Sequence, residues 1–93
     1  MADSVFWEVM RIYMQILPVD GSPPRYYHLH LQEELIGGWS LVREWGFQGS
    51  GGRVMREHFD TLEEAQAAMM RVRDDQLARG YRVVYVQGLE AHD

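Results

Sequence analysis

The sequence contains neither cysteine nor lysine, and its nine basic residues are all arginines. The absence of cysteine excludes disulfide bonds, thiolate nucleophiles and cysteine-ligated zinc, and it permits a reducing compartment. No apolar run approaches the roughly 20 residues of a membrane helix. The N-terminus also lacks the basic segment and apolar run of a secretory signal. We therefore expect a soluble, cytoplasmic protein.

Acidic residues outnumber basic ones by fourteen to nine, which gives a formal net charge of −5. A net negative charge opposes non-specific attraction to the phosphate backbone of nucleic acids. The charges balance only in residues 25–58, which hold four arginines and four acidic residues. The net charge does not forbid a local arginine cluster, and this middle segment is the only place where we expect that one could lie.

The sequence has enough hydrophobic residues to form one packed core. Of its 93 residues 46% are hydrophobic, and three Trp, five Tyr and three Phe are among them. This length corresponds to one domain, covering residues 1–93. The composition argues against a disordered chain.

Alternation of apolar and polar side chains predicts strands. In residues 8–17, Met10, Ile12, Met14 and Ile16 point to one face, which is typical of a half-buried strand. Four further strands are predicted at residues 26–32, 39–45, 53–59 and 81–86. Turn-forming glycines and prolines separate the first four strands, which indicates an antiparallel meander.

Residues 61–79 form the best predicted helix. Asp60 or Thr61 can cap it, acidic residues follow at capping-box spacing, and Gly80 can end it. Its apolar residues recur at three- and four-residue steps and form one stripe: Leu62, Ala65, Ala68, Met69, Val72 and Leu77. One helix cannot bury its stripe alone, so we expect an α+β fold. This is a twisted antiparallel sheet of four to five strands with the helix packed on one face, followed by a frayed tail at 89–93.

The segment at 39–49, Trp-Ser-Leu-Val-Arg-Glu-Trp-Gly-Phe-Gln-Gly, resembles the signature of the WGR domain. This family is named for a Trp-Gly-Arg tripeptide and occurs in poly(ADP-ribose) polymerases and in short bacterial proteins. Further landmarks match in order: the strand beginning at Tyr27, then Phe59, Ala65 and Gly80-Tyr81. The resemblance covers about residues 25–82 and leaves the strand at 8–17 outside. It implies an antiparallel sheet with one helix.

The resemblance also implies a function. In the polymerases the domain binds DNA near strand breaks, with the motif Trp and Arg at the terminal nucleotide, and it contacts neighbouring domains. Here Phe47 stands in place of the motif arginine, and phenylalanine cannot clamp a phosphate with two hydrogen bonds as arginine does. The family roles are therefore transferred only to Arg43, Trp45 and Gly46.

Trp45 and Phe47 flank Gly46 at the start of a glycine-rich loop, residues 46–52. Two aromatic rings beside such a loop can stack on bases or sugars, for about 1–3 kcal/mol per base. Alternatively, both rings fold inward and cap the core. The two interpretations are balanced for Trp45, whereas core packing is favoured for Phe47. The loop joins two predicted strands, which indicates a hairpin connection and not a phosphate-binding loop at a helix N-terminus.

Arg43, Arg53 and Arg56 flank the same loop. Arg53 and Arg56 are three residues apart, so in a regular strand only one of them can share a face with Arg43. These arginines could form a small phosphate-binding patch. The commoner alternative is that they face solvent and pair with Glu44 and Glu57.

Metal binding and catalysis have weak signals. His28 and His30 share a strand face and could bind a metal with His58 as a third ligand. Exposed polar positions on an amphipathic strand explain them better, so no metal or cofactor is expected. No serine lies in a nucleophile-elbow context, and the adjacent acidic pairs are typical of solvated surface. The sequence favours a protein that is not an enzyme.

Two functional hypotheses follow, and neither involves a membrane. The first is a non-catalytic module that binds nucleic acid, for example DNA ends or nicks, at the edge of the Trp-Gly loop. Its candidate residues are Arg43, Trp45, Gly46, Phe47, Arg53 and Arg56. The alternative is a protein-interaction or self-association module without DNA binding. It would use the aromatic edge or the apolar face of residues 10–16.

Overall fold

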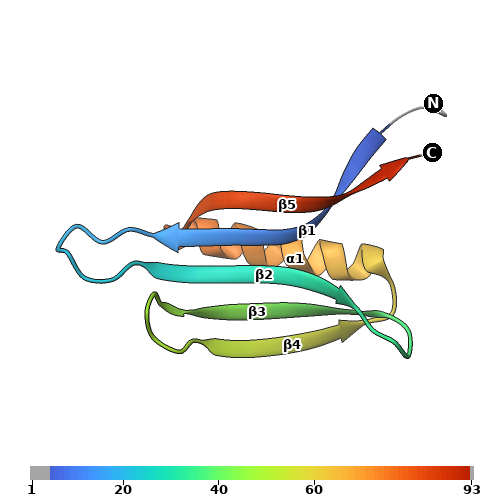
Figure 1. The fold of residues 1–93 in the computed structure, drawn as a ribbon, viewed down its shortest axis with the longest axis horizontal. Helices are drawn as coiled ribbons and strands as arrows, with labels where there is room; N and C mark the ends of the chain where they lie inside the picture. The colour runs from blue at the N-terminus through green and yellow to red at the C-terminus, as the bar shows by residue number, and fades with distance from the viewer. Residues whose placement is uncertain (1–4, 93) are drawn as a thin grey trace.

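The computed structural model describes residues 5–92 of the chain and the side chains of residues 9–88. One helix packs against one face of a five-stranded antiparallel sheet, as Figure 1 shows. In chain order the elements are β1 (Val5–Ile16), β2 (Arg25–Glu33), β3 (Trp39–Phe47), β4 (Arg53–Phe59), α1 (Leu62–Ala78) and β5 (Arg82–His92). The predicted α+β class is confirmed. Over residues 5–92, no helix has the length and apolar character needed to cross a lipid bilayer.

The order of strands across the sheet is β4-β3-β2-β1-β5. Strands β1 to β4 form the predicted meander, and α1 carries the chain back so that β5 pairs antiparallel with the free side of β1. This pairing extends from Gln15↔Arg82 to Val5↔His92. The prediction of a frayed tail is therefore wrong for residues 89–92, because the start of β1 supplies them with a hydrogen-bonding partner. Asp93 lies outside the described residues.

The core lies between the sheet and α1. Its most deeply buried side chains come from three strands and the helix: Ile12, Met14, Leu29, Leu41 and Met69. Burial of each such side chain contributes about 1.5–3 kcal/mol to folding. The alternation predicted for β1 and β2 is confirmed, since Ile12, Met14, Tyr27, Leu29 and Leu31 are buried. The helix covers this face of β1, so it is not available as the docking surface that the sequence suggested.

Helix α1 begins and ends where the sequence predicts. Thr61 Oγ1 accepts a hydrogen bond from the Glu64 backbone N–H at 3.1 Å, and Gly80 leaves the helix with a φ of +104°. The predicted stripe is wrong at its end, because Leu77 is 41% exposed while Gln76 is buried. Steps of three and four residues from Met69 reach position 76, so Gln76 faces the sheet.

The opposite face of the sheet carries no helix, and we call it the helix-free face. Its centre is covered by a row of three tyrosine rings from β2, β1 and β5. Tyr13 stacks on Tyr26 at 6.2 Å and on Tyr85 at 5.5 Å between ring centroids. Gln48, just after β3, donates a side-chain hydrogen bond to the Tyr13 hydroxyl, and its backbone N–H bonds Pro24 at 2.8 Å. The glycine-rich turn is thereby tied down onto the helix-free face.

Close packing explains two glycines of this turn. A Cβ built on Gly46 would lie 3.1 Å from the Cα of Gly52. A Cβ on Gly52 would overlap the hydroxyl of Tyr26 and lie 2.7 Å from the carbonyl oxygen of Trp45. Gly51 has open space around it and no positive φ. At Gly46 and Gly52, glycine is needed for the approach of neighbouring atoms and not for an unusual backbone conformation.

We predict that Gly52→Ala destabilises the fold by about 1–3 kcal/mol, the usual cost of overpacking. The clash involves the backbone of β3 and cannot be relieved by rotating one side chain. The matched control is Gly51→Ala, which should change stability by less than about 0.5 kcal/mol. Urea denaturation followed by tryptophan fluorescence measures both. Equal midpoints for the two variants would contradict this account of the turn.

Candidate nucleic-acid interface

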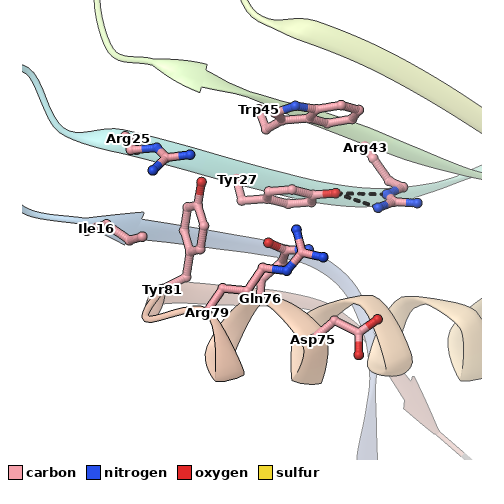
Figure 2. A pocket seen from close by; sticks show the side chains of 9 residues that line it. All are labelled: Ile16, Arg25, Tyr27, Arg43, Trp45, Asp75, Gln76, Arg79 and Tyr81. Atoms are coloured by element: carbon pink, nitrogen blue, oxygen red, sulfur yellow. Dashed lines mark hydrogen bonds between the residues drawn. The ribbon is translucent and has the colours of Figure 1, made fainter.

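A cleft of about 400 Å³ opens on the helix side, where the C-terminal end of α1 meets the ends of β1, β2 and β3 (Figure 2). The residues that line it come from all of these elements: Ile16, Arg25, Tyr27, Arg43, Trp45, Asp75, Gln76, Arg79 and Tyr81. Its volume is in the range of small-ligand sites. Three of these side chains are aromatic and three are guanidinium groups.

Arg43 and Trp45 are held in place by Tyr27. The register pairs Tyr27 with Trp45, and their rings stack at 5.4 Å with an interplanar angle of 8°. The Tyr27 hydroxyl accepts hydrogen bonds from Arg43 Nη2 at 2.6 Å and from Nε at 3.0 Å (Figure 2). The Arg43 guanidinium also lies 5.8 Å from the Tyr27 and Trp45 ring centroids. These contacts fix the direction of both side chains before any ligand arrives.

Arg25 and Arg79 reach the cleft from opposite sides (Figure 2). Arg25 lies at the start of β2, and its guanidinium sits 5.7 Å from the ring centroid of Phe47. Arg79 is the C-cap of α1, and its backbone N–H bonds the carbonyl of Gln76 at 3.0 Å. The same carbonyl accepts the N–H of Tyr81 at 3.1 Å, which brings Tyr81 to the cleft as well.

The cleft is positive although the protein is acidic. Three arginines and one carboxylate, Asp75, line it, whereas the whole chain has a net charge of −5. Among residues 9–88 the salt bridges are His58–Asp60 and Arg73–Asp74, so no arginine of the cleft is paired with a carboxylate within 4.0 Å. Guanidinium groups in this state can bind an anion without first breaking an ion pair.

The structure separates the residues proposed from the sequence. Arg43 and Trp45 line the cleft, and Trp45 is half-buried. Phe47 lies at its margin and is 51% exposed, so the favoured core packing of Phe47 is wrong. As the last residue of β3, Phe47 packs against Arg25 instead of the core. Gly46 faces the other side of the sheet, against Tyr26.

Arg53 and Arg56 also fall on opposite faces, as their spacing requires. Arg53 pairs with Trp45 and so lies on the helix side, although it does not line the cleft. Arg56 lies on the helix-free face, where its Nη1 donates to Gln32 Oε1 at 3.3 Å. The expectation that a cluster would come from residues 25–58 alone is wrong, because Arg79 from the end of α1 joins Arg25 and Arg43.

Sequence reasoning missed Arg25, Arg79, Asp75 and Gln76 as parts of the site. One signal was present, because Arg79 directly precedes the Gly80-Tyr81 landmark. This signal alone could not place Arg79 in the site, because only the docking of α1 on the sheet shows that the C-cap of the helix faces Trp45. Arg25 likewise becomes part of the site through its register partner, Phe47.

The fold and this cleft define a small α+β module with a preformed, positively charged and aromatic surface. Comparison with known families agrees, since the model of the WGR domain matches residues 10–87. The chain belongs to the WGR domain family. The match begins at residue 10 and so includes most of β1 (Val5–Ile16), which the sequence resemblance left outside.

Comparison with curated proteins finds a similar bacterial protein. It is an uncharacterized protein of Sinorhizobium fredii, y4dW, which is 30% identical over 81 residues. The match covers 87% of this chain but 40% of the relative, so the chain spans less than half the length of that protein. No solved structure matches the chain significantly.

His28 and His30 lie away from the cleft, on the helix-free face, beside Tyr13. The His28 and His30 ring centroids are 5.5 Å apart, and β3 separates both from His58 on β4. Within residues 9–88, no group of three potential ligands among His, Cys, Asp and Glu is placed to hold a metal. Arg11 Nη1 lies 3.0 Å from His28 Nε2. A guanidinium only donates, so His28 accepts through Nε2 as the neutral ring.

The surroundings of both rings favour their neutral forms. Burial, followed by the nearby Arg11 guanidinium, lowers the pKa of His28 below its ordinary value of 6.5. Burial, Arg11 and Arg56 lower the pKa of His30 in the same way. As pH falls through 6.5, the unfolded chain therefore takes up protons that the folded chain does not, which favours unfolding.

We predict that the wild-type protein loses stability between pH 7 and pH 5, and that the variant carrying both His28→Gln and His30→Gln loses less. The reason is that these two folded-state pKa values lie below the unfolded value, so their contribution to stability is lost on acidification. Thermal unfolding at a series of pH values measures the difference. Thermal unfolding of both proteins at pH 7 is the control that the double variant keeps the fold. An identical pH dependence in the double variant would contradict the prediction.

Proposed function

We propose that this chain is a non-catalytic module that binds DNA ends or nicks through the helix-side cleft. The observation that carries the proposal is the convergence of Arg25, Arg43 and Arg79 with Trp45 in one preformed cleft. The site residues proposed here therefore differ from the set suggested by the sequence. Arg25, Arg79 and Tyr81 join Arg43 and Trp45, with Phe47 at the margin.

The charge of the cleft supports a phosphate ligand. Guanidinium groups bind phosphate oxygens with pairs of charge-assisted hydrogen bonds. Arg43 is already oriented by the Tyr27 hydroxyl, and its Nη1 donates to the sulfur of Met55, a weak acceptor, at 3.6 Å. Because the protein as a whole is negative, a long duplex surface would be repelled outside the cleft. A short anionic feature, such as a terminal phosphate, fits this distribution of charge better than an extended backbone.

The aromatic rings support a nucleotide as the group that carries the phosphate. Trp45 is held parallel to Tyr27, and Tyr81 meets Tyr27 edge-on at 5.7 Å. A rigid aromatic wall beside a positive cluster is suited to packing against a base or sugar while the arginines bind its phosphate. The family resemblance, in which the motif tryptophan lies at a terminal nucleotide, agrees with this arrangement. No general acid–base pair accompanies it, because Asp75 is the one carboxylate lining the cleft.

We predict that Arg79→Ala weakens binding to a 5′-phosphorylated nicked duplex about tenfold, the usual effect of losing a hydrogen bond to a charged group. Fluorescence anisotropy at two salt concentrations measures this. Wild-type affinity should fall steeply with salt, and the slope should decrease by about one in the variant. The matched control is Arg56→Ala, which removes the same charge from the helix-free face.

Equal losses in Arg79→Ala and Arg56→Ala would contradict binding in the cleft. Failure of the wild type to bind the nicked duplex or a single strand even at low salt would contradict the proposed function itself. Binding that does not depend on salt would point to an apolar protein-type contact instead.

We further predict that Phe47→Arg tightens binding to DNA ends by about tenfold. Phe47 is 51% exposed beside Arg25, so the new guanidinium would add to the margin of the cleft without disturbing the core. Phe47→Ala is the control, because it separates loss of the ring from gain of the charge. The same anisotropy measurement applies, and an unchanged affinity for Phe47→Arg would mean that DNA does not reach this margin.

A further inference from the structure

Strand β5 is an outer edge of the sheet. It pairs with β1 on one side, and no strand within residues 5–92 pairs with its other side. The outward-facing backbone N–H and C=O groups of such a strand are available to another strand. Most proteins protect an edge of this kind with charged side chains, proline, β-bulges or a covering element.

The two edges of this sheet differ in that protection. Strand β4, at the opposite edge, carries four charged or ionisable side chains: Arg53, Arg56, Glu57 and His58. Strand β5 has the consecutive residues Val83, Val84, Tyr85 and Val86, which are 41%, 53%, 46% and 53% exposed. From residue 83 to residue 88 there is neither a charged side chain nor a proline. A β-bulge at Val84, which has no partner on β1 between the pairs Met14↔Val83 and Tyr13↔Tyr85, is the irregularity of this edge.

Helix α1 does not provide the missing cover. It packs mainly against β1, β2, β3 and β4. Val83 and Val86 lie opposite Met14 and Ile12 on the helix side, whereas Tyr85 lies opposite Tyr13 on the helix-free side. Strand β5 therefore exposes apolar side chains on both faces of the sheet as well as a hydrogen-bonding edge.

We infer that β5 pairs antiparallel with β5 of a second copy of this chain. The partner must be a strand that is uncharged at the contact and apolar on both faces, and β5 itself meets both requirements. Strand β4 does not, because its charged side chains would face the apolar ones of β5. A two-fold axis between the copies joins the sheets into one and uses both uncharged edges. The charged β4 edges then lie at the outside, so the assembly stops at a dimer.

The dimer should be weak and should respond to salt in the opposite way to DNA binding. One pair of strands buries less than the roughly 1,200 Å² of a standard stable interface, so we expect dissociation at concentrations on the order of micromolar. Each copy has a net charge of −5, and salt screens the repulsion between the copies. Salt should thus leave the dimer unchanged or strengthen it.

Sedimentation equilibrium without nucleic acid tests the inference. The wild type should shift from monomer to dimer as concentration rises. Val84→Lys should raise the dissociation constant at least tenfold, because it places a charge on the edge of each copy. The matched control is Val54→Lys on β4, a valine that is 60% exposed on the other edge, and it should dimerise as the wild type does. A wild type that remains monomeric at millimolar concentration would overturn the inference, as would Val54→Lys being equally or more disruptive.

Hydrogen exchange on the wild type provides a second test that does not depend on a variant folding. Outward-facing amides of residues 83–87 should exchange more slowly as dimer forms, while those of residues 53–59 should not change. Protection of β4 instead of β5, or a dimer without protection of β5, would overturn the inference. Arg79→Ala should dimerise normally, so failure of the DNA-binding proposal and failure of this one are separate results.

Discussion

The packing of one helix on a five-stranded sheet is the constraint on which the other features depend. A helix is about 10 Å wide, and neighbouring strands are about 4.8 Å apart, so one helix cannot cover five strands. Helix α1 packs on β1 to β4 and buries Ile12, Met14, Leu29 and Leu41 with Met69. What it leaves uncovered is the helix-free face, the strand ends beyond its C-terminus, β5, and residues 53–58 of β4. These regions differ in the partners that their exposed side chains have.

The aromatic and polar side chains of the helix-free face contact one another. Tyr13 stacks between Tyr26 and Tyr85, and its hydroxyl receives a hydrogen bond from Gln48. The Tyr26 hydroxyl donates to Glu44 at 3.0 Å. Aromatic area covers the strands while hydroxyl groups meet solvent or polar neighbours. Because these rings and hydroxyl groups already have partners within the protein, this face has fewer groups available to bind a ligand than the cleft has.

At the strand ends beyond α1, positive charge remains available. The helix stops at Arg79, and the left-handed conformation of Gly80 turns the chain toward Tyr81 and the sheet. Arg79, the residue before this turn, lines the cleft together with Arg25 and Arg43. No carboxylate of the described side chains is paired with any of the three. A local field of this kind is compatible with an acidic protein, since screening limits interactions between exposed charges to about 10 Å at ordinary salt.

The sequence by itself determined the elements, the faces of its strands and the family. Alternation at residues 10–16 and 27–31, the cap at Thr61 and the stop at Gly80 are local signals, and the structure follows each of them. The Trp-Gly signature located Arg43 and Trp45. Only the tertiary structure decided which residues meet across elements. It showed that Arg79 joins the cleft, that Arg56 belongs to the other face and that β5 continues to His92 along β1. Those outcomes depend on strand register and helix docking, which arise from contacts between residues far apart in the chain and leave no periodic pattern in the sequence.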